Sequence, residues 1–174
     1  VNDGEVFRFI SKPWDNQEIQ KIIAEAASIA FDLAATAATP PILPDRMEAG
    51  VLVIEARDET LRVVTRLIGG ACPVYHAKNL DEGLSQLGTH EIALIVADVA
   101  SRGEEIIAAF KALKQERPEI LAIVLTEASD SELVIELINQ AQIFRFVNKP
   151  VNVRLLQSYL HAALQRYLEF KQAP

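Results

Sequence analysis

The sequence predicts an α/β fold: a doubly wound, five-stranded parallel sheet with helices on both faces, preceded by an additional strand and helix. The chain has 174 residues, of which 50% are hydrophobic, enough for one complete core and a smaller second segment. Beyond residue 50, short apolar runs alternate with longer segments of helical periodicity. Because strands that alternate with helices are joined by right-handed crossovers, the strands are expected to be parallel.

The expected strands are short and rich in β-branched residues, a composition typical of strands that are covered by helices on both faces. The second strand has the weakest pattern and the others are almost continuously apolar. The five expected strands are 51–54, 73–77, 92–97, 120–125 and 143–147.

The expected helices follow the strands in order, and the residues at their ends support them. Asp58 is the candidate N-cap of the first helix, which Gly69 ends, and Asn79 is the candidate N-cap of the second. Pro118 ends the third helix, because proline has no backbone N–H to donate. The five expected helices are 59–68, 80–87, 104–117, 131–140 and 152 to about 172.

The beginning of the chain repeats its end. Residues 6–13 match residues 143–150 at a constant offset, and a long helical pattern follows each copy. We therefore interpret residues 1–37 as the last strand and helix of a second, incomplete domain. Residues 38–49 contain three closely spaced prolines and are interpreted as a linker, which leaves residues 50–174 as the complete domain.

Composition excludes several classes of protein. The net charge of −7 argues against direct nucleic-acid binding, which needs an excess of Lys and Arg. No apolar run approaches the roughly 18–20 residues that span a bilayer, and the acidic start does not resemble a signal peptide. The single cysteine, Cys72, has no intramolecular partner, and no Cys/His cluster suggests zinc. We expect a cytoplasmic protein that does not contact membranes.

Four polar side chains follow the ends of predicted strands: Glu55, Asp98, Thr126 and Lys149. Because the carboxyl ends of parallel strands meet at one edge of a sheet, these side chains are expected to converge on a shallow cleft. The Asp98 carboxylate is suited to accept a phosphoryl group as an acyl phosphate. Glu55 and Asp98 are suited to share Mg²⁺, while Thr126 and Lys149 are suited to contact phosphoryl oxygens.

The segments that end in these side chains resemble the receiver domain of two-component response regulators, which has a flavodoxin-like fold, over essentially all of residues 50–172. The N-terminal segment resembles the same corner of an upstream receiver, so the parent protein resembles a tandem-receiver regulator. The segments that carry the resemblance are 51–55, 94–98, 123–126 and 144–150.

The resemblance implies a role for each matching residue. Asp98 would accept a phosphoryl group from a sensor histidine kinase or a phosphotransfer protein, with Thr126 and Lys149 completing the catalytic set. Thr126 and Phe146 would form the switch pair, and the fourth helix, fifth strand and fifth helix of the domain would form the signalling surface. The peptide between Lys149 and Pro150 is often cis in the family.

The resemblance also implies a Mg²⁺ site, with Glu55, Asp98 and Ala100 at the ligand positions. Two departures weaken that implication. The family's usual second acid is replaced by Ala56, whose methyl group coordinates nothing, and the residue after Thr126 is the large, anionic Glu127 where a small residue is usual.

The resulting expectation is a phosphorelay receiver with at most self-catalysed phosphoryl transfer and autodephosphorylation, and with its output domain elsewhere in the parent chain. The alternative is a degenerate pseudo-receiver that acts as a constitutive interaction or dimerisation module, since the apolar stripe of the N-terminal helix would suit a homodimer. A phosphatase resembling the haloacid dehalogenases ranks third, because Asp98-Val99-Ala100 lacks the second aspartate of the usual Asp-x-Asp motif.

Overall fold

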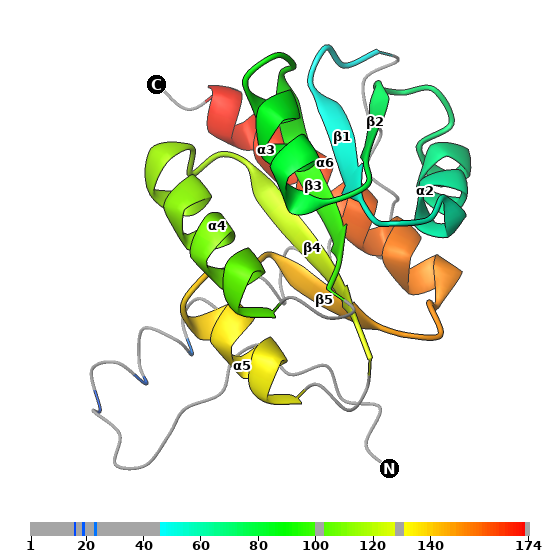
Figure 1. Ribbon diagram of the computed structural model, residues 1–174. Helices are drawn as coiled ribbons and strands as arrows, with labels where there is room; N and C mark the ends of the chain where they lie inside the picture. Colours follow the sequence, from blue (N-terminus) through cyan, green and yellow to red (C-terminus); the bar gives the residue numbers. More distant parts are fainter. Residues whose placement is uncertain are drawn as a thin grey trace. The chain divides into compact units, whose positions relative to one another are not determined.

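The computed structural model describes residues 46–99, 103–127 and 131–172, together with Asn16, Ile19 and Ile23, which are helical. The chain divides into two units, Val1–Pro40 and Pro41–Pro174, and the sheet lies entirely within the second (Figure 1). The N-terminal strand and most of the linker that the sequence predicts fall outside the described residues, as does Ala100.

A five-stranded parallel sheet forms the centre of the second unit, in the order β2-β1-β3-β4-β5. This arrangement confirms the predicted fold class. The interiors of β1, β3 and β4 are apolar because helices cover both faces of the sheet. The strands are β1 (Gly50–Ile54), β2 (Val74–Ala77), β3 (Ile92–Asp98), β4 (Leu121–Thr126) and β5 (Arg145–Asn148).

Two layers of helices cover the sheet. α2 and α6 pack on one face and contact each other, while α3, α4 and α5 cover the opposite face (Figure 1). Within the described residues, no helix has both the length and the apolar character needed to cross a membrane. The helices are α2 (Glu59–Ile68), α3 (Leu80–Leu87), α4 (Gly103–Glu116), α5 (Ser131–Asn139) and α6 (Val153–Gln172).

The main core lies between the sheet and the α2/α6 layer. Alternate residues of a strand point to opposite faces, and one set from each central strand meets the buried side of α6. Each of these buried aliphatic side chains contributes roughly 1.5–3 kcal/mol to folding. The set includes Val51, Val53, Leu94, Val96, Ile123, Leu125, Leu156, Leu160 and Leu164.

The helix ends agree with the sequence at Asp58, Gly69 and Asn79. Asn79 Oδ1 accepts a hydrogen bond from the Glu82 amide at 2.9 Å, and Gly69 ends α2 with a φ of 61°. Asp58 does precede α2, but its side chain makes no capping hydrogen bond. Asp58 is thus the N-cap residue that the sequence predicts, but its side chain pairs with Arg62 at 2.7 Å and leaves the capping to another group.

Because all strand pairs are parallel, the carboxyl ends of the five strands lie at one edge of the sheet. The chain passes from β1 to β2 on one side and from β3 to β4 on the other, so β1 and β3 flank the point where the order reverses. In sheets of this kind ligands bind outside the carboxyl ends of the strands, at that point. The carboxyl edge is therefore where a functional site is expected.

Candidate functional site

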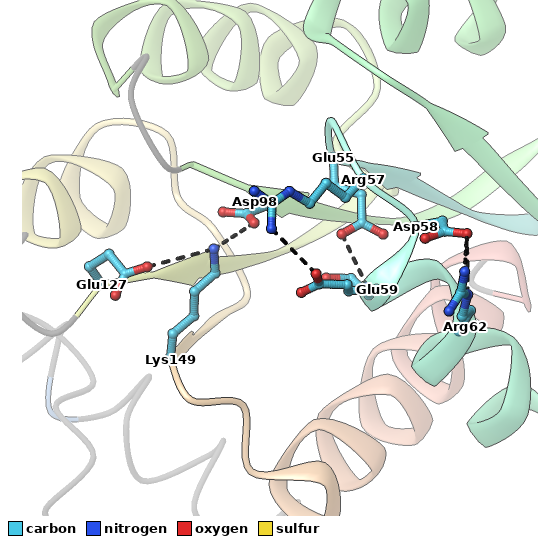
Figure 2. A network of polar contacts seen from close by, with 9 residues as sticks. Glu55, Arg57, Asp58, Glu59, Arg62, Asp98, Glu127 and Lys149 are labelled. Atoms are coloured by element: carbon cyan, nitrogen blue, oxygen red, sulfur yellow. Dashed lines mark hydrogen bonds and ion pairs between the residues drawn. The ribbon is translucent and has the colours of Figure 1, made fainter.

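Asp98 and Lys149 meet at the carboxyl edge of the sheet (Figure 2). Asp98 is the last residue of β3, and Lys149 follows β5 directly. Lys149 Nζ donates to Asp98 Oδ2 at 2.5 Å, and the two side chains are 25% and 21% exposed respectively. The Lys149 amide also donates to the carbonyl of Thr126 at 2.9 Å, which positions its backbone against β4.

The second carboxylate oxygen of Asp98 differs from the first in its surroundings. Oδ1 is buried and accepts no hydrogen bond within the described residues. Leaving a buried charged oxygen unpaired is costly, so this atom favours a further cation, proton or covalent partner. Oδ1 is therefore the candidate nucleophilic atom of the site.

Thr126 lies at the end of β4, next to Asn148 of β5. The Thr126 side chain is buried, and its hydroxyl donates to Asn148 Oδ1 at 3.3 Å. Phe146 lies two residues before Asn148 on β5 and is half-buried. The two residues of the expected switch pair are thus linked through one short strand, because Asn148 and Phe146 share a face by strand alternation.

Glu55 has a position that the sequence did not indicate. Its carboxylate is buried and lies at the start of α2 (Figure 2). Its Oε2 accepts a hydrogen bond from the amide of Thr60 at 3.1 Å, and its Oε1 accepts one from the amide of Leu61 at 2.7 Å. Strand alternation explains this, because Val51 and Val53 face α2 and Glu55 continues the same series. Glu55 therefore accepts hydrogen bonds from amides in the first turn of α2, as the side chain of an N-cap residue usually does.

The donor set does not fit the Mg²⁺ site that the family resemblance implies. Mg²⁺ needs near-octahedral oxygen ligands, including one or two carboxylates. Ala56 offers no side-chain ligand, and both oxygens of Glu55 are held by the α2 amides. No group of three or more His, Cys, Asp or Glu among the described residues is suited to hold a metal ion. Of positions 55, 56 and 98, only Asp98 keeps a carboxylate oxygen, Oδ1, without a partner in the described part of the chain.

Glu127 approaches the same lysine from the end of β4. Its Oε1 lies 3.8 Å from Lys149 Nζ, and its side chain is about half exposed at 54%. The Lys149 ammonium thus forms ion pairs with two carboxylates, the partly buried Asp98 and the more exposed Glu127 (Figure 2). Glu127 therefore places negative charge beside the position that an incoming anion would take.

Curated relatives match this chain at low identity. The DNA-binding transcriptional regulator NtrC of Salmonella typhimurium is 25% identical over 130 residues, covering 72% of this chain and 27% of NtrC. The hydrogenase transcriptional regulatory protein HoxA of Cupriavidus necator is 26% identical over 103 residues, covering 59% of this chain and 21% of HoxA. The chain thus spans about a quarter of the length of these relatives.

Solved structures share the fold. The signal receiver domain of an HD domain-containing protein from Pseudomonas fluorescens Pf-5 superposes with a TM-score of 0.64 at 20% identity, covering 78% of this chain and 99% of that one. A response regulator from Thermotoga maritima gives a TM-score of 0.61 at 23% identity, with 68% and 99% covered. In addition, residues 51–161 match the response regulator receiver domain family. The chain therefore belongs to the response regulator receiver domains of two-component signalling systems.

Proposed function

We propose that this receiver accepts a phosphoryl group on Asp98 from a histidine kinase or phosphotransfer protein. Receiver domains in general work with histidine kinases and output domains, and they generally bind Mg²⁺. The observation that carries the proposal is the 2.5 Å contact between Lys149 Nζ and Asp98 Oδ2. The buried Oδ1, which no described residue contacts by a hydrogen bond, is then the nucleophilic atom.

The chemistry follows from these two atoms. Asp98 Oδ1 attacks the phosphorus of the donor, a new O–P bond forms, and the bond between phosphorus and the donor's nitrogen breaks. Lys149 stays beside Asp98 and compensates the charge that develops on the phosphoryl oxygens. Beyond this transfer and the later hydrolysis of the acyl phosphate, we propose no enzymatic activity.

The relay starts at Thr126 and runs along β5. The hydroxyl of Thr126 exchanges its 3.3 Å bond with Asn148 for a bond to a phosphoryl oxygen. Asn148 then loses a partner, and the change reaches Phe146 through the strand they share. The surface formed by α5, β5 and α6, which are the fourth helix, fifth strand and fifth helix of the domain, passes the signal to an output domain elsewhere in the parent cytoplasmic protein.

A second candidate function is a pseudo-receiver that docks or dimerises without phosphorylation. Three features of the carboxyl edge favour it. The Glu55 carboxylate is bound to the α2 amides, Ala56 supplies no metal ligand, and the Glu127 carboxylate lies 3.8 Å from the Lys149 ammonium. In this candidate the Lys149 ammonium is neutralised within the chain, and the domain keeps one conformation.

The test is the intact mass of the full chain after incubation with phosphoramidate, with and without Mg²⁺. The proposal predicts one added phosphoryl group in the wild type and none in Asp98→Asn, which keeps the shape of the side chain but lacks the nucleophile. An adduct that persists in Asp98→Asn contradicts the assignment of the acceptor. No adduct in a folded wild type favours the pseudo-receiver.

A further inference from the structure

The charge balance at Asp98 is incomplete without a metal ion. A phosphoryl group adds close to two negative charges, and Glu127 adds a third nearby, whereas Lys149 is the one cation that contacts Asp98 in the described residues. The usual compensation by Mg²⁺ lacks ligands here, because Ala56 is apolar and Glu55 is bound to α2. Another positive group is needed if the acyl phosphate is to form.

Arg57 is placed to supply that charge. It follows Ala56 in the loop between β1 and α2, and its side chain extends from that loop toward Asp98 (Figure 2). Its guanidinium forms an ion pair with Glu59 at 3.5 Å, between side chains that are 82% and 74% exposed. Such exposed pairs are weak, so the guanidinium can exchange Glu59 for a stronger anion.

A guanidinium is chemically suited to this exchange. It stays protonated at every relevant pH, and its planar set of N–H donors binds two phosphoryl oxygens at once. The Arg57 side chain is also long enough to reach a phosphoryl oxygen on Asp98 from the loop, whereas the methyl group of Ala56 is not.

We infer that the Asp98 site works without a divalent cation, and that Arg57 provides the second positive charge beside Lys149. The inference rests on the proposed phosphoryl acceptance. With phosphoramidate, the P–N bond breaks, an O–P bond to Asp98 forms and ammonia leaves, while Arg57 moves from Glu59 to the new phosphoryl oxygens. Arg57 is thus a substrate-binding residue that belongs to this chain rather than to the general family pattern.

Arg62 provides a matched control. It is also an exposed arginine near the start of α2, but it is paired with Asp58 at 2.7 Å and lies on the side of the loop away from Asp98 (Figure 2). Arg57→Gln and Arg62→Gln therefore remove the same charge from the same region of the chain, and by this inference only the first affects the Asp98 site.

The first experiment measures metal binding alone. We expect isothermal titration of the wild-type chain to give no saturable Mg²⁺ binding up to about 10 mM, because a single open carboxylate is a poor site. Ala56→Asp adds a second carboxylate and is expected to bind. Saturable binding by the wild type, or no gain in Ala56→Asp, overturns the metal part of the inference whatever the phosphorylation result.

The second experiment uses beryllium fluoride, a non-covalent mimic of an aspartyl phosphate, and follows thermal unfolding in excess EDTA. We expect stabilisation of the wild type and Arg62→Gln, and at least about a tenfold weaker apparent affinity in Arg57→Gln. Equal affinities in all three overturn the role of Arg57.

Two further outcomes separate this inference from the proposed function. Stabilisation that appears only when Mg²⁺ replaces EDTA overturns the inference and leaves phosphoryl acceptance standing. No stabilisation in either buffer, together with no phosphoramidate adduct, overturns both.

Discussion

Glu55 Oε1 accepts a hydrogen bond from the backbone amide of Leu61 at 2.7 Å. Glu55, which follows Val51 and Val53 on the same face of the sheet, thus stabilises the first turn of α2. The neighbouring amide of Thr60 donates to the other oxygen of the same carboxylate. The contact fixes the loop that contains Ala56 and Arg57, and it commits the carboxylate to the helix. The family resemblance assigns Glu55 to a metal site, whereas in this structure its carboxylate stabilises the start of α2.

Removing this carboxylate should destabilise the domain. Glu55→Ala leaves two amides at the start of α2 without their acceptor, and we expect a loss of about 1–3 kcal/mol in the free energy of unfolding. Glu55→Gln keeps one acceptor oxygen and should lose less. Urea denaturation measures both, with Asp58→Ala as the control because Asp58 makes no capping bond. A loss in Glu55→Ala no larger than in Asp58→Ala contradicts this account of α2.

At the amino edge of the sheet, the carboxylate of Glu91 contacts two side chains of α6. The buried Tyr167 hydroxyl donates to Glu91 Oε1 at 2.9 Å, and Lys171 Nζ lies 3.0 Å from the same oxygen. Hydrogen bonds from Lys171, and then from Tyr167, lower the pKa of Glu91 below its ordinary value of 4.5. Because the folded state favours the ionised carboxylate, its contribution is present above pH 4.5 and is lost as the pH falls through the lower native pKa.

Tyr167→Phe should cost about 1.5 kcal/mol at neutral pH, the lower end of the range for a hydrogen bond to a charged acceptor, because the Glu91 side chain is partly exposed. It should also bring the pKa of Glu91 closer to its ordinary value, so the difference between wild type and variant shrinks as the pH falls through this range. Urea denaturation of both proteins at several pH values checks this. A difference that stays constant across the acid range contradicts a role for Glu91 ionisation.

Cys72 should be unreactive while the protein is folded. The side chain is buried, and burial raises the pKa of its thiol to about 11. At pH 8 only about one thiol in a thousand is then ionised, and the thiolate is the reactive form. We expect slow labelling by a thiol reagent in buffer and complete labelling within minutes in urea. Rapid labelling of the native protein would show that this part of the core opens readily.

Glu127 should slow phosphorylation. Its carboxylate shares Lys149 with Asp98, so an incoming phosphoryl group meets a negative charge that already contacts the ammonium. Glu127→Ala and Glu127→Gln should both raise the initial rate of adduct formation, by about tenfold if the opposing electrostatic free energy is about 1.4 kcal/mol. The exposed Glu116, at the end of α4, gives the control variant Glu116→Gln. A rate increase in Glu127→Ala but not in Glu127→Gln assigns the effect to size rather than charge.

The fold and the central pair were predictable because their signals are simple. Nearly continuous apolar strands alternating with helices indicate a parallel sheet, and such a sheet brings the last residue of β3 and the residue after β5 to one edge. The contact between Asp98 and Lys149 follows from that order, although the two residues are far apart in the sequence.

The position of Glu55 could not be predicted by the same reasoning. Local preference assigns the cap of α2 to Asp58, because aspartate is common at that position. Whether a strand-end glutamate reaches the same amides depends on the distance between β1 and α2, which the tertiary packing sets. The fifth strand likewise begins at Arg145 rather than Ile143, because Gln142 has a φ of 48° and the chain is still turning there.

The most direct test of phosphoryl acceptance locates the acceptor atom. Sodium borohydride reduces an aspartyl phosphate to homoserine, so phosphoramidate-treated protein is reduced, digested and mapped by mass spectrometry. The account predicts homoserine at position 98 in the wild type and none in Lys149→Met, which loses the ammonium that contacts Asp98. A reduced side chain at Glu127, or no reduced residue anywhere in protein that is shown to be folded, would contradict it.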